Sequence, residues 1–318
     1  MEGVLILITF IYAIFILMTK PKVISIVGPT ASGKSALAID LALIFNGEVI
    51  SADSRQVYRE LDLGSGKVTT KEMKGVPHHL LNVANLDYIY TGADFIKDAN
   101  LAISDILNRE KLPIIAGGTF FYIELLKGES QSAPVEPNPT LRAELEQLSD
   151  EQLFAKLNNL DPERAQSIDS KNRRRLVRAL EIIDSLGKVP TISKKESDFD
   201  FLTIGIRIDK DILKQRIEQR LSDRLEKGMV EEVENLLKNG ISPVRLHDLG
   251  LEYRYITEYL EGKITYEKMK EKIVIKSLQF AKRQYTWLKR DKSIVWFDFP
   301  VTLNKIENTV NNFLAITE

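Results

Sequence analysis

The sequence predicts an α/β fold in which a parallel sheet is covered by helices on both faces and a small all-helical domain is inserted. Three observations support this prediction. Short apolar runs alternate with amphipathic segments, which is typical of strand–helix–strand units. A glycine-rich loop lies between the first apolar run and the first amphipathic segment. Residues 129–201 carry their apolar residues only at helical spacing, so they predict helices without strands.

The composition narrows the possible functions. The chain has 318 residues, of which 44% are hydrophobic and 28% charged, and its formal net charge is −1. This balance argues against a protein that coats nucleic acid over its whole surface, although it allows a local basic patch. Because there is no cysteine, disulfides and cysteine-bound zinc or iron–sulfur sites are excluded. The chain has three histidines, which leaves few candidate ligands for a histidine-based metal site.

An apolar leader, residues 1–21, precedes the first predicted strand. Its run from Val4 to Met18 is shorter than the ~20 residues of a membrane span. Two explanations stay open, namely a start site placed too early, with Met18 as the true start, or a membrane anchor. In the second case Lys20 and Lys22 place the body on the cytoplasmic side. We favour the early start site and expect a cytoplasmic protein.

The loop after the first strand carries the most specific motif. Residues 23–27 form the strand, the loop matches G-x-x-x-x-G-K-[ST], and a helix is predicted at 36–45. This P-loop arrangement binds phosphate through backbone N–H groups and a helix N-terminus. We expect Lys34 to reach the outer phosphate and Ser35 to ligate magnesium. The predicted diphosphate-binding loop consists of Gly28, Pro29, Thr30, Ala31, Ser32, Gly33, Lys34 and Ser35.

Two further apolar runs extend the predicted P-loop NTPase-like sheet. Residues 48–52 form a strand that ends on Asp53, and residues 113–116 form a strand that ends in Gly117-Gly118-Thr119. Such sheets place ligands at the carboxyl ends of their strands. A nucleotide hydrolase or kinase usually has a magnesium-binding acid near the end of a further strand. The run at 113–116 ends in glycine instead, which favours a diphosphate site with Asp53 beside it over a motor or a switch GTPase.

The rest of the chain divides into a discontinuous core and the insertion. Residues 61–83 are predicted to be loop, and Thr91 is predicted to cap a helix that extends to residue 107. Three prolines within 134–139 mark a linker. The last strand is predicted at 294–297. The predicted parts are the leader, 1–21; the P-loop core, 22–128 and 202–318; and the helical insertion, 129–201.

Basic residues cluster on three predicted helices. Basic residues beside aromatic ones suit a phosphate backbone and unstacked bases, whereas a solvated helix face is the plainer explanation. Trp287 lies at helical spacing, which favours core packing over base stacking. Arginines at a spacing of four share one helix face. The clusters are residues 173–175 with Arg178; Lys282, Arg283, Lys289, Arg290 and Lys292; and Arg216, Arg220 and Arg224.

Five motifs follow one another along the chain. They are GPTASGKS at 28–35, DSRQVY at 53–58, GVPHHL at 75–80, GGT at 117–119 and KRQYTWL at 282–288. In this order they resemble the bacterial tRNA dimethylallyltransferase family, over about Lys22 to Asp298. The resemblance implies transfer of a dimethylallyl group from dimethylallyl diphosphate to N6 of adenosine 37 in the tRNA anticodon loop. It also implies Mg2+ as cofactor and a monomer without a stable protein partner.

The resemblance further implies roles for individual residues. Asp53 accepts the proton of the adenine amino group as a general base. Lys34 and Arg220 stabilise the departing diphosphate, and Thr119 approaches the reacting centre. The adenine has to be extruded from its stacked loop. The residues implied in tRNA binding are Asp53, Ser54, Arg55, Gln56, Arg174, Arg175, Arg178, Arg283 and Gln284.

Two other functions also use a P-loop. An enzyme that prenylates free adenine nucleotides does not need an insertion with an arginine cluster, which this chain has. A small-molecule kinase predicts a magnesium-binding acid near Ile115, which the sequence lacks. Contact with a membrane is expected only if the run at 4–18 is an anchor.

Overall fold

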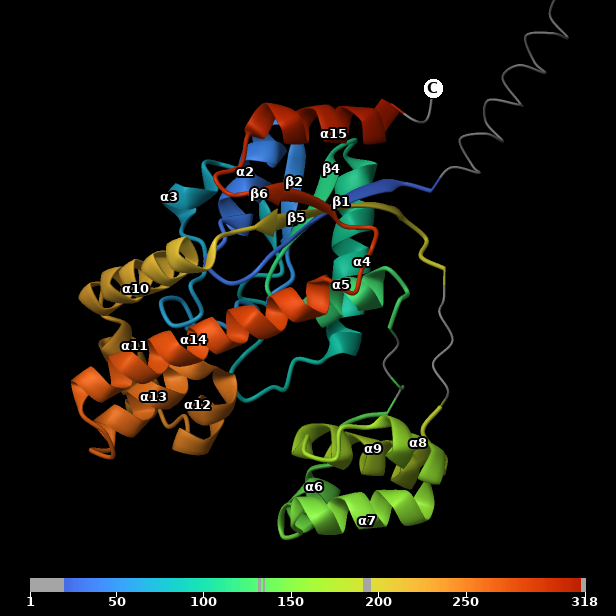
Figure 1. Cartoon of the computed structure of the whole chain (residues 1–318), viewed down its shortest axis with the longest axis vertical. Helices are drawn as coiled ribbons and strands as arrows, with labels where there is room; N and C mark the ends of the chain where they lie inside the picture. The colour runs from blue at the N-terminus through green and yellow to red at the C-terminus, as the bar shows by residue number, and fades with distance from the viewer. Residues whose placement is uncertain (1–19, 131–132, 134, 191–195, 316–318) are drawn as a thin grey trace, which may run out of the picture. The chain divides into compact units, whose positions relative to one another are not determined.

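The computed structural model describes residues 20–130, 133, 135–190 and 196–315. These residues form two compact units (Figure 1). The larger unit combines the chain up to Lys127 with the chain from Glu196 onward, and the smaller unit is Gly128–Lys195. Within the described ranges, no helix is both long enough and apolar enough to cross a membrane. The apolar run at 4–18 lies outside them.

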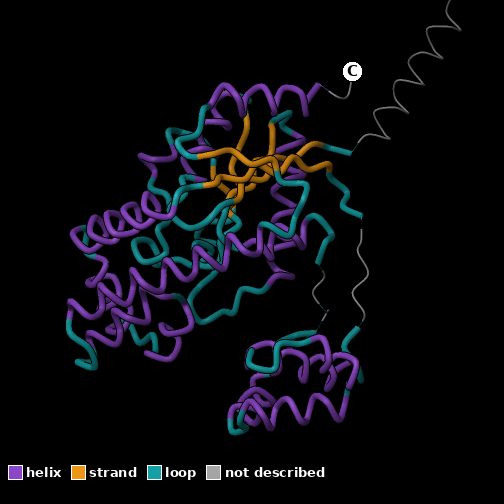
Figure 2. The backbone as a smooth tube through the Cα atoms, viewed as in Figure 1, coloured by secondary structure: helices purple, strands orange, loops and turns teal. Residues whose placement is uncertain are grey.

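The larger unit is built on a parallel sheet, which confirms the predicted α/β fold (Figure 2). Its strands are β1 Lys22–Val27, β2 Gly47–Ser51, β3 His78–His79, β4 Leu112–Ala116, β5 Asp200–Arg207 and β6 Val295–Asp298. In the described chain they lie in the order β3-β2-β4-β1-β5-β6, and every neighbouring pair is parallel. Ile24 of β1 lies opposite Ile114 of β4 and Leu202 of β5. The loops after β1, β2 and β4 therefore share the carboxyl edge, where such sheets bind ligands.

Helices cover both faces of the sheet, because side chains along each strand alternate between the faces. The covering helices are α2 Lys34–Ile44, α4 Gly92–Asn108, α5 Phe120–Leu126 and α15 Leu303–Ala315. Ile24 and Ile26 of β1 pack on one face with α2 and α15. Val23 and Val27 pack on the other face with α4 and α5. This burial fixes β1 and, with it, the start of the P-loop.

A layer of helices follows β5 in the chain. The helices are α10 Lys210–Glu226, α11 Met229–Lys238, α12 Pro243–Leu249, α13 Leu251–Leu260 and α14 Tyr266–Leu288. Together with residues from the stretch 57–86 they form a second hydrophobic cluster, in which Tyr253 and Met269 are buried. The long helix α14 begins in that cluster at Met269 and ends with Leu288 in the core beside the sheet (Figure 1). It therefore joins the helical layer to the sheet.

The smaller unit has a separate core. In its described part it contains α6 Pro139–Glu146, α7 Asp150–Leu160, α8 Pro162–Ser167 and α9 Arg173–Leu186. Leu153 and Leu176 are buried between these helices. Glu181 is also buried and is held by Arg142 at 2.7 Å. The compact unit ends at Lys195, whereas the sequence predicts that the insertion reaches residue 201. The predicted boundary is too late because Asp200 and Phe201 already belong to β5 of the larger unit.

Two short elements lie in the stretch 61–83 that the sequence predicts to be loop. They are the helix α3, Thr70–Met73, and the strand β3. The helix is closed by a capping box between Thr69 and Glu72. Elements of four and two residues are too short to show a hydrophobic period, so the prediction missed them.

Glu48 links β2 to β3 and to the segment between α4 and β4. Its carboxylate on β2 is 1% exposed and accepts hydrogen bonds from Arg109 at the end of α4, from Lys111 before β4 at 2.8 Å and from His79 of β3 at 2.7 Å. The hydrogen bond from Arg109 has the largest effect, and together with those from Lys111 and His79 it holds the pKa of Glu48 well below its usual value of 4.5. The ionised carboxylate therefore stabilises the folded state.

We expect Glu48→Gln to lower the free energy of unfolding by about 3 kcal/mol at pH 7, because three cationic or donor groups lose a buried anionic partner. The pKa of Glu48 is lowered in the folded state, so its contribution is present above pH 4.5 and is lost as the pH falls toward the folded-state pKa. Urea unfolding of both proteins from pH 7 to pH 3 measures the difference. The difference in free energy of unfolding between the two proteins should shrink by about 1.4 kcal/mol for each pH unit below pH 4. A difference that stays constant to pH 3 would contradict the prediction.

Candidate active site

The P-loop lies at the carboxyl end of β1 and leads into α2. Lys34 is 9% exposed, and its Nζ donates a hydrogen bond to the carbonyl oxygen of Pro29 at 2.8 Å. The amides of Lys34 and Ser35 lie in the first turn of α2, where no carbonyl of the helix accepts from them. The Oγ of Ser32 is buried and has no hydrogen-bond partner among the described residues. A phosphate group can accept from all of these donors, so the loop suits an anion.

Two side chains from the helical layer hold the P-loop from outside. Arg216 of α10 donates from Nε to the carbonyl oxygen of Ala31 at 2.7 Å, and its guanidinium lies 4.8 Å from the ring centre of Phe299. Gln284 of α14 accepts from the amide of Thr30 at 2.8 Å. The phosphate-binding loop is therefore fixed by contacts with helices that follow it in sequence by well over a hundred residues.

Asp53 and Thr119 lie together at the ends of the neighbouring strands β2 and β4. The Oγ1 of Thr119 accepts from the amide of Ser54 at 2.9 Å, and the amide of Thr119 donates to Ala52 at 3.0 Å. Gly117 makes this approach possible, because a Cβ at that position would lie 2.1 Å from the carbonyl oxygen of Ala52. Asp53 itself accepts from the amide of Arg55 at 2.9 Å, which fixes one carboxylate oxygen. The geometry thus sets a carboxylate beside a threonine hydroxyl.

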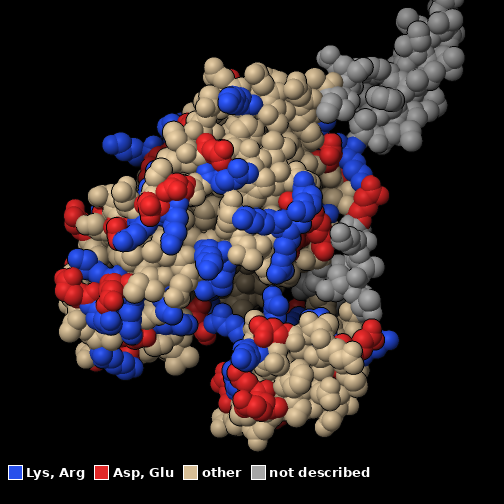
Figure 3. All heavy atoms as spheres, viewed as in Figure 1, with Lys and Arg blue, Asp and Glu red and all other residues tan. Residues whose placement is uncertain are grey.

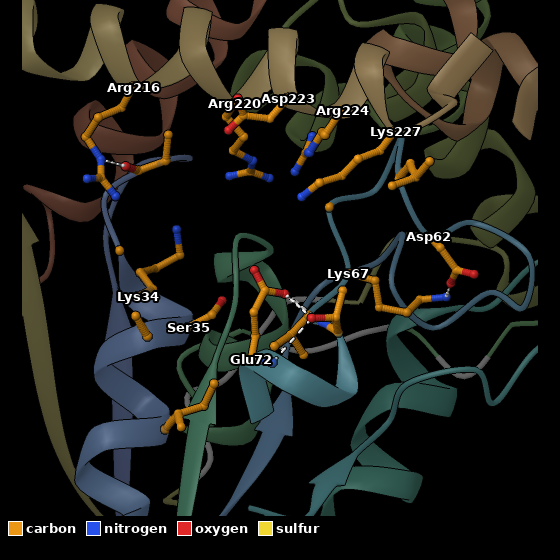
Figure 4. Close-up of a pocket in the computed structure, with 18 of the residues that line it drawn as sticks. Lys34, Ser35, Asp62, Lys67, Glu72, Arg216, Arg220, Asp223, Arg224 and Lys227 are labelled. Carbon is orange, nitrogen blue, oxygen red and sulfur yellow. Dashed lines mark hydrogen bonds and ion pairs between the residues drawn. The ribbon is translucent and has the colours of Figure 1, made fainter. Parts of the chain in front are cut away.

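A cavity of about 620 Å³ opens beside the P-loop. In Figure 4, Arg220 and Arg224 extend from α10 into the cavity. Lys34 and Ser35 of α2, together with Glu72 and Lys67, lie across the cavity from these arginines. A cavity lined by several cations next to helical N–H groups suits a phosphorylated ligand.

The positive charges in this cavity are only partly neutralised. Burial, and then the charge of Arg220, lower the pKa of Lys34 to about 7, against the opposing effect of Asp53. Burial and the neighbouring Arg224 lower the pKa of Arg220 to about 10. Arg224 has an ion pair with Glu252, at 3.6 Å. Because these cations destabilise one another in a buried setting, the site favours an anionic ligand.

A turn at residues 62–66 forms the wall that faces the arginines. Glu232 of α11 accepts from the backbone amides of Asp62, Leu63 and Gly64, at distances from 2.6 to 3.1 Å. The turn brings Gly66, with φ of +65°, against the arginines, where a Cβ would lie 1.5 Å from Nη2 of Arg224. Glu232 therefore shapes the cavity without lining it.

The structure gathers the four predicted catalytic residues at one edge of the sheet. Lys34 and Arg220 line the cavity, and the charge of Asp53 acts on both of them. Thr119 lies beside Asp53 through the contact with Ser54. The other predicted residues of this loop, Ser54, Arg55 and Gln56, follow Asp53 directly in sequence. The side-chain amide of Gln56 accepts from the hydroxyl of Ser51 at 3.1 Å and donates to the carbonyl oxygen of Gly66 at 3.3 Å.

The predicted tRNA-binding residues have unlike surroundings. Arg283 on α14 is exposed, whereas the adjacent Gln284 is 4% exposed and uses its amide within the protein. In the smaller unit, Arg174 and Arg175 are exposed on α9. Arg178 instead donates to the carbonyl oxygen of Val135 at 2.7 Å and to Glu181. Of these residues, Arg283, Arg174 and Arg175 present their side chains to solvent.

Sequence reasoning missed three contributors to the site. Glu232 and Glu252 lie in charged helices, where nothing in the spacing distinguishes them from solvated residues. Arg216 is predicted only as a member of the cluster with Arg220 and Arg224, although its side chain holds the P-loop. The prediction for Trp287 is confirmed, because the ring packs against the core and its Nε1 donates to Glu124 at 2.5 Å.

Comparison with known proteins gives one consistent family. Residues 56–291 match the sequence model of the IPP transferase family. A tRNA dimethylallyltransferase of Thermomicrobium roseum is 40% identical over 288 residues, which are 88% of each chain. One from Shouchella clausii is 38% identical over 309 residues, or 94% of this chain and 98% of the relative.

Solved structures agree with this result. The full-length tRNA isopentenylpyrophosphate transferase of Bacillus halodurans has a TM-score of 0.69 and 34% identity, over 94% of this chain and 97% of its own. A eukaryotic dimethylallyltransferase acting on tRNA has a TM-score of 0.74 and 30% identity, over 87% of this chain and 74% of its own.

We expect Gly66→Ala to weaken binding of inorganic diphosphate about tenfold, because the new Cβ displaces Arg220 and Arg224 and costs at least one charged hydrogen bond. Titration calorimetry measures the affinity. Gly75→Ala is the matched control, since Gly75 has φ of +82° but no heavy atom within 4 Å of its Cβ position. Both substitutions strain the backbone at a positive φ, but only the Cβ introduced at position 66 collides with the arginines. Equal affinities of the two variants would contradict the assignment of the cavity.

Proposed function

The chain belongs to the IPP transferase family, and on that premise we propose that it transfers a dimethylallyl group from dimethylallyl diphosphate to N6 of adenosine 37 in a tRNA anticodon loop. The products are N6-isopentenyladenosine in tRNA and diphosphate. The observation that carries the proposal is the common position of a P-loop and Asp53 at one sheet edge, with Thr119 beside Asp53.

The P-loop side stabilises the leaving group. An allylic carbon tolerates developing positive charge, so the barrier depends mainly on the negative charge that collects on the diphosphate. Lys34, Arg220 and the N–H groups at the start of α2 are the donors that face it. Burial makes them effective, because the cavity walls exclude part of the screening solvent.

The residues present suit a magnesium ion that is held mainly by the ligand. Ser35 is exposed at the start of α2 and lines the cavity. No group of three or more acidic or histidine side chains that could hold a metal occurs in the described ranges. Mg2+ usually keeps several waters and binds through few protein ligands together with substrate phosphates. When bound there, it supplies further charge neutralisation to the diphosphate.

Asp53 is the proposed general base. As the bond from the adenine N6 to the allylic carbon forms, the carbon–oxygen bond to diphosphate breaks and one N6 proton passes to the Asp53 carboxylate. The hydrogen bond from the amide of Arg55 to one carboxylate oxygen fixes the orientation of the other. Thr119 is proposed to lie near the bridging oxygen, because its hydroxyl is held beside Asp53 through Ser54.

Recognition of tRNA is assigned to the exposed basic side chains. Arg174 and Arg175 of the smaller unit and Arg283 of α14 are exposed and suit phosphate contacts. Lys and Arg side chains on the face in Figure 3 are interspersed with Asp and Glu, so the surface shown is not a uniform basic coat. This suits binding of one structured RNA loop, from which the adenine is extruded toward Asp53.

The alternatives predict other features. Prenylation of free nucleotides does not use a basic helix such as α9, and the named relatives act on tRNA. A kinase would place an acid at the end of β4, where this chain has Gly117.

We expect Asp53→Asn to lower kcat for transfer to tRNA by about 10²- to 10⁴-fold, because the amide cannot accept the N6 proton. Nucleoside mass analysis after timed incubation measures the rate. Asp223→Asn is the matched control, since Asp223 lines the same cavity and its side chain accepts a hydrogen bond from Gln219 of the same helix. The proposed base would be wrong if Asp53→Asn kept the activity of Asp223→Asn.

We expect the double variant Arg174→Ala, Arg175→Ala to raise the Kd for tRNA and to leave affinity for inorganic diphosphate unchanged. Loss of two phosphate contacts should reduce the slope of log K against log salt by about 1.4 to 1.8. Fluorescence anisotropy at several salt concentrations provides the measurement. Lys156→Ala, another exposed cation of the smaller unit, is the control. An unchanged salt slope in the double variant would remove α9 from the tRNA-binding surface.

A further inference from the structure

We infer that Gln284 is a positioning residue that fixes the diphosphate loop relative to the loop of Asp53 and Thr119. The inference rests on the proposed function and assigns Gln284 a role different from direct tRNA contact. Its side chain is 4% exposed on α14. Its Oε1 accepts from the amide of Thr30 in the P-loop at 2.8 Å. Its Nε2 donates to the carbonyl oxygen of Gly118 at 3.0 Å.

The second of these contacts lies next to the proposed base. A Cβ built on Gly118 would lie 3.2 Å from Nε2 of Gln284 and 3.5 Å from Oδ2 of Asp53. The next residue, Thr119, holds the amide of Ser54. The Gln284 amide therefore spans from the loop that binds the leaving group to the loop that carries the base and its threonine neighbour.

The chemistry requires a side chain that donates and accepts at once. A primary amide does both in a fixed plane, whereas a carboxylate only accepts and an aliphatic side chain does neither. In group transfer, the leaving group and the base act on one carbon and one nitrogen at the same moment. A displacement of about 1 Å between such groups can cost about 100-fold in rate. A buried amide that bonds to both loops limits this displacement.

Contact with tRNA is the competing explanation. Both polar atoms of the Gln284 amide are already bonded within the protein, and the side chain is buried. Its neighbour Arg283 is exposed and is available for RNA. The two roles differ in the kinetic constant they affect, since positioning acts on kcat and contact acts on KM for tRNA.

The first test replaces the amide by an aliphatic group of similar size. With Gln284→Leu we expect kcat to fall 10- to 100-fold, while KM for tRNA stays within twofold of the wild-type value. Gln279→Leu, at an exposed position of the same helix, should leave both constants unchanged. A raised KM with unchanged kcat would overturn the inference in favour of tRNA contact, and unchanged constants would also overturn it.

The second test guards against a general loss of folding. In Gln284→Glu, a protonated carboxyl group can donate to Gly118 and accept from Thr30, but the ionised form cannot donate. We expect burial and the charge of Asp53, which lies across Gly118 from this side chain, to raise the pKa of the introduced carboxyl group. The ratio of variant to wild-type kcat should therefore rise about tenfold between pH 8.5 and pH 6.0. The ratio for Gln284→Leu should stay flat. A flat ratio for Gln284→Glu would contradict positioning by this amide.

A third measurement separates this inference from the proposed function. If the wild-type chain transfers no prenyl group to tRNA, the proposed function fails, and binding of inorganic diphosphate then judges the role of Gln284. Calorimetry should show about fivefold weaker binding for Gln284→Leu than for Gln279→Leu, because the P-loop has lost its contact at Thr30. Equal affinities would show that Gln284 does not hold the loop.

Discussion

Unneutralised positive charge in a buried site is the constraint on which the rest of this structure depends. Lys34, Arg220 and Arg224 face one cavity, and among the described residues Glu252 is the one carboxylate in an ion pair with any of them. Buried cations without partners cost stability, and here burial depresses their pKa values. In the proposed function, a bound diphosphate would supply the missing anion, and the same charges would then stabilise the ligand and its departing form.

Such a site requires that the loops around it be held firmly, and the helical layer provides this. Arg216 holds the P-loop from α10, Gln284 holds it from α14, and Glu232 holds the opposite turn from α11. The helix α14 is itself fixed by packing at both ends, in the helical cluster and beside the sheet. The layer that follows β5 therefore both supports the candidate active site and lines its cavity, since Arg216, Arg220 and Arg224 extend into it from α10.

The sequence allowed prediction of the parts of the site that are local. The P-loop, Asp53 and Gly117-Gly118-Thr119 each follow a strand directly, so strand order and the parallel sheet suffice to bring them together. The supporting contacts could not be predicted, because they join residues as far apart as Thr30 and Gln284 or Gly64 and Glu232. Such pairs depend on tertiary packing, which leaves no periodic signal. Gln284 lies in the motif at 282–288, and its burial, which the motif does not predict, is the observation from which we infer a positioning role.

Transfer to tRNA is the central claim, and nucleoside mass analysis tests it most directly. The full chain is incubated with dimethylallyl diphosphate, Mg2+ and unmodified tRNA that reads codons beginning with U, and in parallel with AMP and with ATP. The account predicts isopentenyladenosine in tRNA, little product on AMP and no consumption of ATP. Product on AMP alone would contradict it in favour of a nucleotide prenyltransferase. ATP consumption without a prenylated product would contradict it in favour of a kinase.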